Sequence, residues 1–155
     1  MENLNLQIAE RAELFVKSKV PYQHRGMSFF GCDCTGLLVA ILRQLGFLQD
    51  FTMPNYDRDW NLHIDNADLP LMTNFFGKTA DSIPKNEKTT GDILVFGFGR
   101  CQRAHTGVYL RDNLFAHCFV TAGRCVYGTL QNSQWGKRWT NTYRMNSNKL
   151  RAYVQ

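Results

Sequence analysis

The sequence predicts an α+β fold in which N-terminal helices pack on a C-terminal antiparallel sheet. Apolar residues recur at helical spacing in the first third of the chain and in strand-like runs after Gly91. Because the helices come first and the strands follow, an alternating α/β arrangement is disfavoured. No internal repeat or linker-like stretch divides the 155 residues, so we expect one domain over 1–155.

The first predicted helix begins at Leu4 and ends near Lys19. Its apolar stripe consists of Leu4, Ile8, Ala12, Phe15 and Val16. Pro21 disfavours helix at the residue before it, so we expect an extended or turning segment from Val20 to Gly26.

The second predicted helix runs from about Cys34 to Leu45, and Gly46 follows it as a stop signal. Asp33 is a good N-cap residue, which puts Cys34 in the first turn. There the unpaired backbone N–H groups and the helix dipole favour a negative charge. We therefore expect a lowered pKa for the Cys34 thiol and a role for it as a nucleophile.

The remaining elements are predicted with less regular patterns. Residues 47–88 contain a turn at 55–57, a helix over 67–76 and a surface loop at 84–88. After Gly91, strands are expected over 93–96, 105–110, 114–120 and 124–130, with a short last strand over 150–154. Residues 111–113 form the expected hairpin loop.

Net charge and cysteine content narrow the class of protein. The formal net charge of +5 favours an anionic partner, but the basic residues are scattered, which argues against nucleic acid. Five cysteines without a C-x-x-C pair exclude the thioredoxin motif and the zinc knuckle, and we expect reduced thiols. The N-terminus lacks the features of a signal peptide, and no apolar run approaches the roughly 20 residues that span a membrane. We therefore expect synthesis in the cytoplasm and no membrane insertion. If the target lies outside the cytoplasm, the protein must reach it by a route other than a signal peptide.

A cysteine nucleophile requires a base and a group that orients the base. His24 and His63 lie in irregular sequence, whereas His105 and His117 lie on adjoining predicted strands. We expect Cys34 and His105 to rest as thiolate and imidazolium, with His117 fixing the ring of His105.

Hairpin register tests this arrangement. A regular two-residue turn would place His105 and His117 on opposite faces of the sheet. A three-residue loop or a bulge places them on the same face as diagonal neighbours, with His117 opposite Gly107, which leaves room for the imidazole. The triad therefore predicts an odd loop or a bulge between the two strands.

Five segments together resemble the NlpC-type cell-wall peptidases. Asp33-Cys34-Thr35-Gly36 resembles their D-C-S/T-G motif, and His105-Thr106-Gly107-Val108-Tyr109 resembles their histidine motif. Phe115-Ala116-His117 resembles the strand that supplies their third polar residue. Gly91-Asp92 and Pro21-Tyr22 with Gly26 also resemble family segments, and the matches cover residues 21 to 120 in the family's order.

The resemblance implies a papain-like fold and a cysteine hydrolase that cleaves amide bonds in peptidoglycan stem peptides, without a cofactor or a metal ion. It implies Cys34 as nucleophile, His105 as general base and acid, and His117 as orienting residue. Tyr22 is expected to contact the substrate or the oxyanion. Asp33 and Thr35 are expected to contact a substrate amine, unless Asp33 serves only as a helix cap.

Further features are similar to the phage-encoded branch of this family. They are Tyr22-Gln23-His24-Arg25-Gly26, Gly31-Cys32-Asp33-Cys34, the Tyr56/Trp60 segment and Trp139. This likeness implies phage tail proteins as partners and action at the cell wall as a virion component.

Several alternatives remain open at this point. A non-catalytic tail or structural module could keep the same fold, and an amidase or acyltransferase could use the same thioester. A zinc site from Cys32, Cys34, His105 and His117 is disfavoured by the C-x-C spacing. Trp135 and Trp139 either pack the C-terminal segment or line a glycan groove.

Overall fold

The computed structural model describes residues 3–54, 70–99 and 101–155, and it confirms the α+β fold with the helices first. The first half of the described chain contains α1 (Leu4–Lys17), β1 (Met27–Ser28), β2 (Gly31–Cys32) and α2 (Cys34–Gln44), followed by α3 (Pro70–Thr79). The second half contains β3 (Ala80–Ser82), the 3-10 helix η2 (Lys85–Glu87), β4 (Ile93–Phe98), β5 (Cys101–Arg111), β6 (Leu114–Phe119), β7 (Arg124–Thr129), α4 (Gln134–Arg138), β8 (Trp139–Met145) and α5 (Ser147–Ala152).

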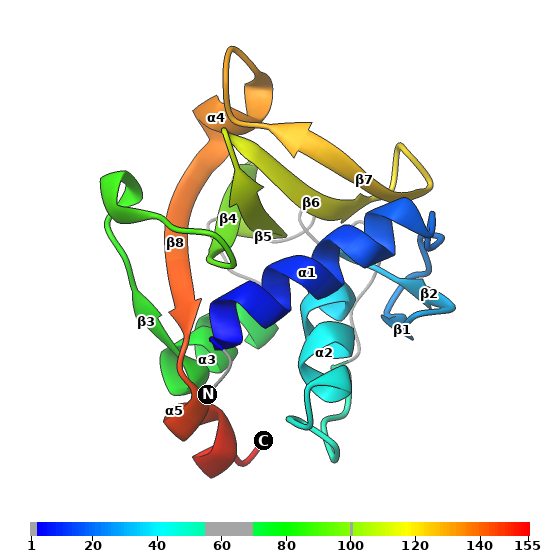
Figure 1. Ribbon diagram of the computed structural model, residues 1–155, viewed down its shortest axis with the longest axis vertical. Coiled ribbons are helices and arrows are strands. Elements are labelled where there is room, and N and C mark those ends of the chain that lie inside the picture. The colour runs from blue at the N-terminus through cyan, green and yellow to red at the C-terminus, as the bar shows by residue number, and fades with distance from the viewer. Residues whose placement is uncertain (1–2, 55–69, 100) are drawn as a thin grey trace.

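A six-stranded antiparallel sheet organises the molecule, in the order β3-β8-β4-β5-β6-β7. The helices α1 and α2 both contact β5 and β6, and Figure 1 shows them on one side of the sheet. The strand β8 returns from the end of the chain to lie between β3 and β4. The strands β5 and β6 therefore lie beneath the helix that carries Cys34.

The two faces of the sheet bury different clusters. Side chains of β4 alternate between them: Ile93 and Val95 pack in the core beneath α1 and α2, whereas Leu94 and Phe96 point to the other face. There they pack with Trp135, which α4 supplies. The molecule thus has a large core on the helical side and a smaller aromatic core on the opposite side.

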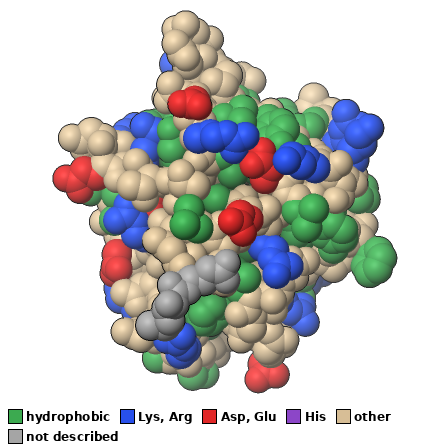
Figure 2. Space-filling model, viewed as in Figure 1, with side chains coloured by type: hydrophobic (Ala, Val, Ile, Leu, Met, Phe, Trp, Pro, Cys, Tyr) green, Lys and Arg blue, Asp and Glu red, His purple; other side chains and the backbone are tan. Residues whose placement is uncertain are grey.

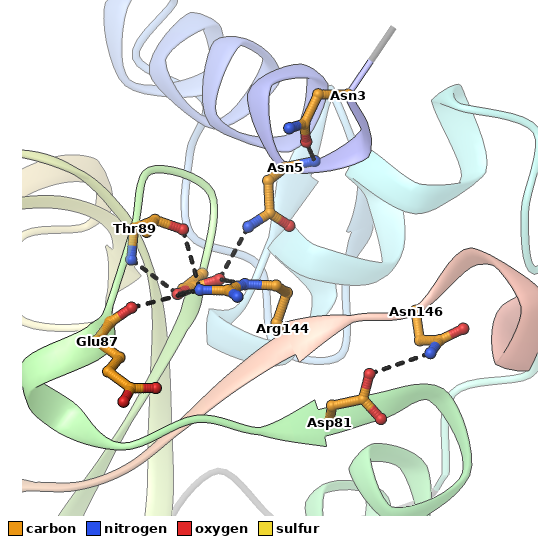
Figure 3. Close-up of polar contacts among 8 residues, drawn as sticks. Asn3, Asn5, Asp81, Glu87, Thr89, Arg144 and Asn146 are labelled. Atoms are coloured by element: carbon orange, nitrogen blue, oxygen red, sulfur yellow. Dashed lines mark hydrogen bonds and ion pairs between the residues drawn. The ribbon is translucent and has the colours of Figure 1, made fainter. Parts of the chain in front are cut away.

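A buried carboxylate joins the N-terminal helix to the sheet (Figure 3). Asp92, which has no exposed surface, accepts hydrogen bonds from Asn5 Nδ2 at 2.8 Å, from Arg144 Nε and from the Thr89 backbone N–H. Gly91 has a φ of +93°, and a Cβ atom there would lie 2.0 Å from the carbonyl oxygen of Asn5. The Gly-Asp pair therefore allows α1, β4 and β8 to meet closely.

Some predicted boundaries require correction. The predicted strand over 150–154 is wrong, because residues 147–152 form α5, whose N-cap Asn146 accepts a hydrogen bond from the Lys149 N–H. The sequence patterns also gave no strand at β3 or β8. The helix predicted over 67–76 appears as α3 over 70–79, while the turn at 55–57, Trp60 and residues 67–69 lie outside the described residues.

The surface in Figure 2 carries basic and acidic side chains in an interspersed pattern. The net positive charge of the chain is therefore not gathered into one basic patch on this face. Within the described ranges, every helix is too short or too polar to cross a membrane.

Candidate active site

Asp33 builds the turn from which Cys34 projects. One of its carboxylate oxygens accepts hydrogen bonds from the Gly36 N–H at 2.8 Å and from Thr35 Oγ1 at 3.3 Å. The other accepts from the backbone N–H of Arg25 at 2.9 Å. Because a Cβ atom at position 36 would lie 1.7 Å from the carbonyl oxygen of Gly26, that position requires glycine. The D-C-T-G motif therefore holds Cys34 in the first turn of α2, as the sequence predicted.

The β5–β6 hairpin closes through a two-residue turn and a bulge. Asp112 and Asn113 form the turn with φ values of +50° and +64°, and the register shifts between Tyr109 and Arg111. Beyond the shift, Val108 pairs with Ala116, which is the register that places the two histidines on one face. The predicted bulge is confirmed. The space beside Gly107 is filled by the ring of Phe115, however, and not by the imidazole of His117.

The hairpin brings His105 and His117 into direct contact. His105 Nε2 lies 2.8 Å from His117 Nδ1, and the two rings are nearly perpendicular. Both side chains are buried, with 5% and 2% of their surface exposed. Two hydrogen-bonded neutral rings can share this contact only if one donates and the other accepts.

Aromatic rings enclose the histidine pair. Trp135 stacks on His105 at 5.1 Å between ring centroids and meets His117 edge-on at 4.9 Å. Phe98 and Phe119 complete the enclosure. The sequence analysis missed this role of Trp135, which it assigned to packing or to a glycan groove. The contacts of Trp135 with the histidines depend on the packing of α4 against β4, which lies far from α4 in sequence, so no local pattern indicates them.

Thr106 links the helix that carries Cys34 to the strand that carries His105. Thr106 Oγ1 donates a hydrogen bond of 2.8 Å to the carbonyl oxygen of Cys34. The backbone N–H of Thr106 also favours the thiolate of Cys34. Among the described residues, the structure shows no hydrogen bond between Cys34 Sγ and His105. The structure joins the two histidines directly. Side-chain alternation along β5 places Thr106 on the face of Cys34, whereas His105 lies on the opposite face with Phe96 and Trp135.

Burial shifts the pKa values of Cys34, His105 and His117. Burial, with a further contribution from the charge of Asp33, raises the pKa of Cys34 to about 12. The backbone N–H groups of Thr106, Thr35 and Cys34 lower this pKa, but by less. Burial and the neighbouring His117 hold the pKa of His105 well below 6.5, and burial lowers the pKa of His117 to about 4. In this geometry burial therefore favours the neutral thiol and the neutral imidazole over the expected thiolate and imidazolium pair.

The residues predicted to bind substrate lie around the same turn. Tyr22 is half-buried, forms a parallel bridge with Cys32 and donates its backbone N–H to the Gly123 carbonyl at 2.9 Å. Asp33 and Thr35 are 3% and 5% exposed. The hydrogen bonds of Asp33 described above make it a helix cap. The four residues of the disfavoured zinc site do not gather, because the Cys32 thiol lies with those of Cys118 and Cys125.

Comparisons with known proteins give a consistent result. A family model for the NlpC/P60 family matches residues 19–144. The "Probable endopeptidase NlpC" of Escherichia coli K12 is 28% identical over 126 residues, which cover 81% of this chain and 69% of that protein. The murein DD-endopeptidase MepS/murein LD-carboxypeptidase of the same strain is 25% identical over 81% of this chain.

The solved structures support the same fold. An NlpC/P60 family protein from Bacillus cereus superposes with a TM-score of 0.64 at 17% identity, over 93% of this chain and 41% of that one. The chain spans 56% of the length of the MepS relative, so it corresponds to part of that protein.

Proposed function

Since the chain belongs to the NlpC/P60 family, we propose that it is a cysteine peptidase that cleaves amide bonds in peptidoglycan stem peptides. One observation carries the proposal: Thr106 joins the helix terminus of Cys34 to the strand of His105, and His117 holds the ring of His105. The relatives named as endopeptidases, one of them acting on murein, support this substrate class.

The first half of the reaction forms a thioester. Cys34 Sγ attacks the amide carbonyl carbon while its proton passes to His105, because the resting thiol and imidazole are both neutral. The backbone N–H of Cys34 lies at the start of α2, where it can donate to the developing oxyanion. His105 then gives its proton to the departing amine.

Water completes the cycle. His105 takes one proton from the attacking water and returns it to the departing sulfur, which regenerates the thiol of Cys34. The carboxylic acid product then releases its proton to solvent and becomes a carboxylate. His117 assists by its hydrogen bond to His105 Nε2, which leaves Nδ1 of His105 as the atom that exchanges protons with the sulfur.

We also propose that Tyr22 and Thr35 contact the substrate beside the nucleophile. Tyr22 packs at the edge of the same apolar cluster as Cys34, and Thr35 follows Cys34 in the chain. Asp33 contributes a fixed negative charge next to a substrate amine, although three hydrogen bonds already engage its carboxylate.

The proposal is tested by product analysis. The purified protein and a Cys34→Ala variant are incubated with defined stem-peptide fragments, and the products are identified by mass spectrometry. We expect amide cleavage by the wild type and none by Cys34→Ala. Cys101→Ala, which removes a buried thiol that the proposed reaction does not use, serves as the control and should cleave. Equal fragments from wild type and Cys34→Ala would refute the peptidase assignment.

The same experiment distinguishes hydrolysis from acyl transfer. An added amine competes with water for the thioester, so transfer would appear as a product carrying that amine. We propose hydrolysis as the main outcome. A protein that binds the fragments without producing either product would be a non-catalytic module of the same fold.

We further propose a phage or prophage origin with tail proteins as partners. The segments at 22–26 and 31–34 and Trp139 support it, while Tyr56 and Trp60 lie outside the described residues. Detection of this chain by mass spectrometry in purified virions is the test, and its absence from them would contradict the assignment.

A further inference from the structure

Three cysteine side chains lie close together in the core against which Cys34 packs, and the proposed reaction uses none of them. Cys32 ends β2, while Cys118 and Cys125 lie on β6 and β7. Their sulfur atoms all lie within 4.8 Å of one another, and Cys32 Sγ is 3.6 Å from Cys125 Sγ. Because 93 residues separate Cys32 from Cys125, the fold alone creates this thiol cluster.

The thiol cluster is enclosed by apolar core. Cys32 and Cys118 have no exposed surface, and Cys125 is 1% exposed. Cys118 and Cys125 are direct partners across β6 and β7, and Cys118 Sγ donates to the carbonyl oxygen of Cys32 at 3.0 Å. The three thiols therefore point toward one another within a region closed to solvent.

The spacing of the sulfur atoms suits a metal ion better than a disulfide. Thiolate sulfur lies about 2.3 Å from Zn²⁺, so three sulfurs around one ion are roughly 4 Å apart. The thiol cluster already has such spacing. A disulfide would need two of the sulfurs to approach to about 2.05 Å and would leave the third without a role. Within the described residues, this is the one group of three potential ligands of this kind.

We propose that Cys32, Cys118 and Cys125 form a binding site for a thiophilic d10 metal ion of the Zn²⁺ type. Soft sulfur ligands favour such ions over Mg²⁺ or Ca²⁺. Each thiol loses its proton as its sulfur–metal bond forms, so a divalent ion releases three protons and no electrons are transferred. The site is separate from Cys34, His105 and His117.

The position of the site gives it a structural consequence. Cys32 immediately precedes Asp33, the cap of the helix that carries Cys34. A bound ion would tie β2 to β6 and β7 and so brace the segment that holds the nucleophile. The ion should therefore raise the unfolding temperature whether or not the peptidase is active.

Cadmium titration tests the proposal without using activity. The Cys34→Ala protein is prepared reduced and free of metal, so that the nucleophile adds no thiolate, and Cd²⁺ is added while the ultraviolet thiolate-to-cadmium band is followed. We expect saturation at one ion per chain, a rise in unfolding temperature and displacement by Zn²⁺. Cys34→Ala/Cys125→Ser should lose at least about 100-fold in affinity, since even loss of an outer partner of a ligand costs 10–100-fold.

The matched control is Cys34→Ala/Cys101→Ser. Cys101 is also 1% exposed but lies outside the thiol cluster, so this variant should bind Cd²⁺ unchanged. If Cys125→Ser does not fold by circular dichroism, Cys118→Ala replaces it. Absence of the band in folded Cys34→Ala, or equal binding after loss of a cluster cysteine, would overturn the proposal. The proposal would also be overturned if the reduced protein did not bind Cd²⁺ but formed a Cys32–Cys125 disulfide in air.

Discussion

Burial governs the protonation of Cys34 more strongly than the helix terminus does. Three backbone N–H groups lower its pKa, yet burial and the charge of Asp33 raise it to about 12. His105 is likewise held neutral by burial and by His117. In the proposed reaction the proton therefore leaves the sulfur during attack on the substrate and not before it. The sequence showed the helix terminus, but it could not show the depth of burial, which depends on the packing of distant strands.

The pH profile of the reaction should reflect the neutral base. Because the pKa of His105 is lowered well below 6.5, its neutral form persists as the pH falls below 6.5, and it is lost only as the pH approaches the lowered pKa. We expect kcat/KM for stem-peptide cleavage to hold its plateau from neutral pH to below pH 6.5 before it declines. Measurement from about pH 4 to about pH 9 tests this. An acid limb above pH 6.5 would instead indicate a resting imidazolium.

Substitution of Asp33 should separate its two effects. Asp33→Asn keeps a good N-cap but removes the charge that raises the pKa of Cys34, so alkylation of Cys34 by iodoacetamide should become faster at a fixed pH. Asp33→Ala should also lose about 1 kcal/mol of unfolding free energy, measured in urea. Asn146→Ala removes the cap of α5 and serves as control: it should lose comparable stability and leave the alkylation rate unchanged.

At the scale of elements, the junction between α2 and β5 depends on one hydroxyl. Thr106→Val removes the hydrogen bond to the Cys34 carbonyl at nearly constant volume, so we expect a loss of about 1 kcal/mol in urea unfolding. Displacement of the nucleophile should also lower kcat by at least roughly tenfold. Thr90→Val removes the comparable bond of Thr90 Oγ1 to the Leu110 carbonyl and should leave kcat unchanged. Equal kcat values for the two variants would contradict a positioning role of Thr106.

Elements defined by local pattern were predictable, and elements defined by distant partners were not. The apolar spacing of α1 and α2 and the hairpin of β5 and β6 depend on neighbours in sequence. The residues of β8 show no strong alternation, and this strand forms because β4 and β3 flank it. In the predicted last strand, Leu150 and Tyr153 are apolar, but the Asn146 cap commits the segment to a helix.

In the candidate site, too, contacts within one hairpin were predictable from the sequence and contacts between distant elements were not. Register arithmetic on the sequence paired His105 with His117, because one hairpin carries both residues. The cover that Trp135 provides depends on α4 packing across the sheet, and no local pattern indicates that contact. The meeting of the Cys32 thiol with those of Cys118 and Cys125, without Cys34, also arises only in the folded chain.

At the scale of the whole molecule, Asp92 connects the two ends of the chain, because it accepts hydrogen bonds from Asn5 in α1 and from Arg144 in β8. Arg144→Met would leave the fully buried carboxylate of Asp92 without its cation, and we expect a loss of about 3 kcal/mol in urea unfolding. Lys149→Met breaks an exposed pair with Asp81 and should cost less than about 1 kcal/mol. Equal losses of unfolding free energy in the two variants would show that the buried Asp92–Arg144 pair stabilises the protein no more than an exposed pair does.

The same denaturation tests the single domain proposed for residues 1–155. Because Asp92 joins α1 to β4 and β8, the helices and the sheet should unfold together. We expect coincident transitions by circular dichroism and by tryptophan fluorescence. Two separated transitions would indicate that the N-terminal helices and the sheet are independent units.

The bulge between Tyr109 and Arg111 also bears on how the chain can change length during evolution. Loss of one residue between Arg111 and Asn113 would let the hairpin close as a regular two-residue turn, with Tyr109 still opposite Phe115 and the histidines still in contact. Loss of one residue within β6 would turn His117 to the helical face. Descendants of this sequence can therefore accept a deletion at the turn. The number of residues between the two histidines can change there while their side chains stay in contact.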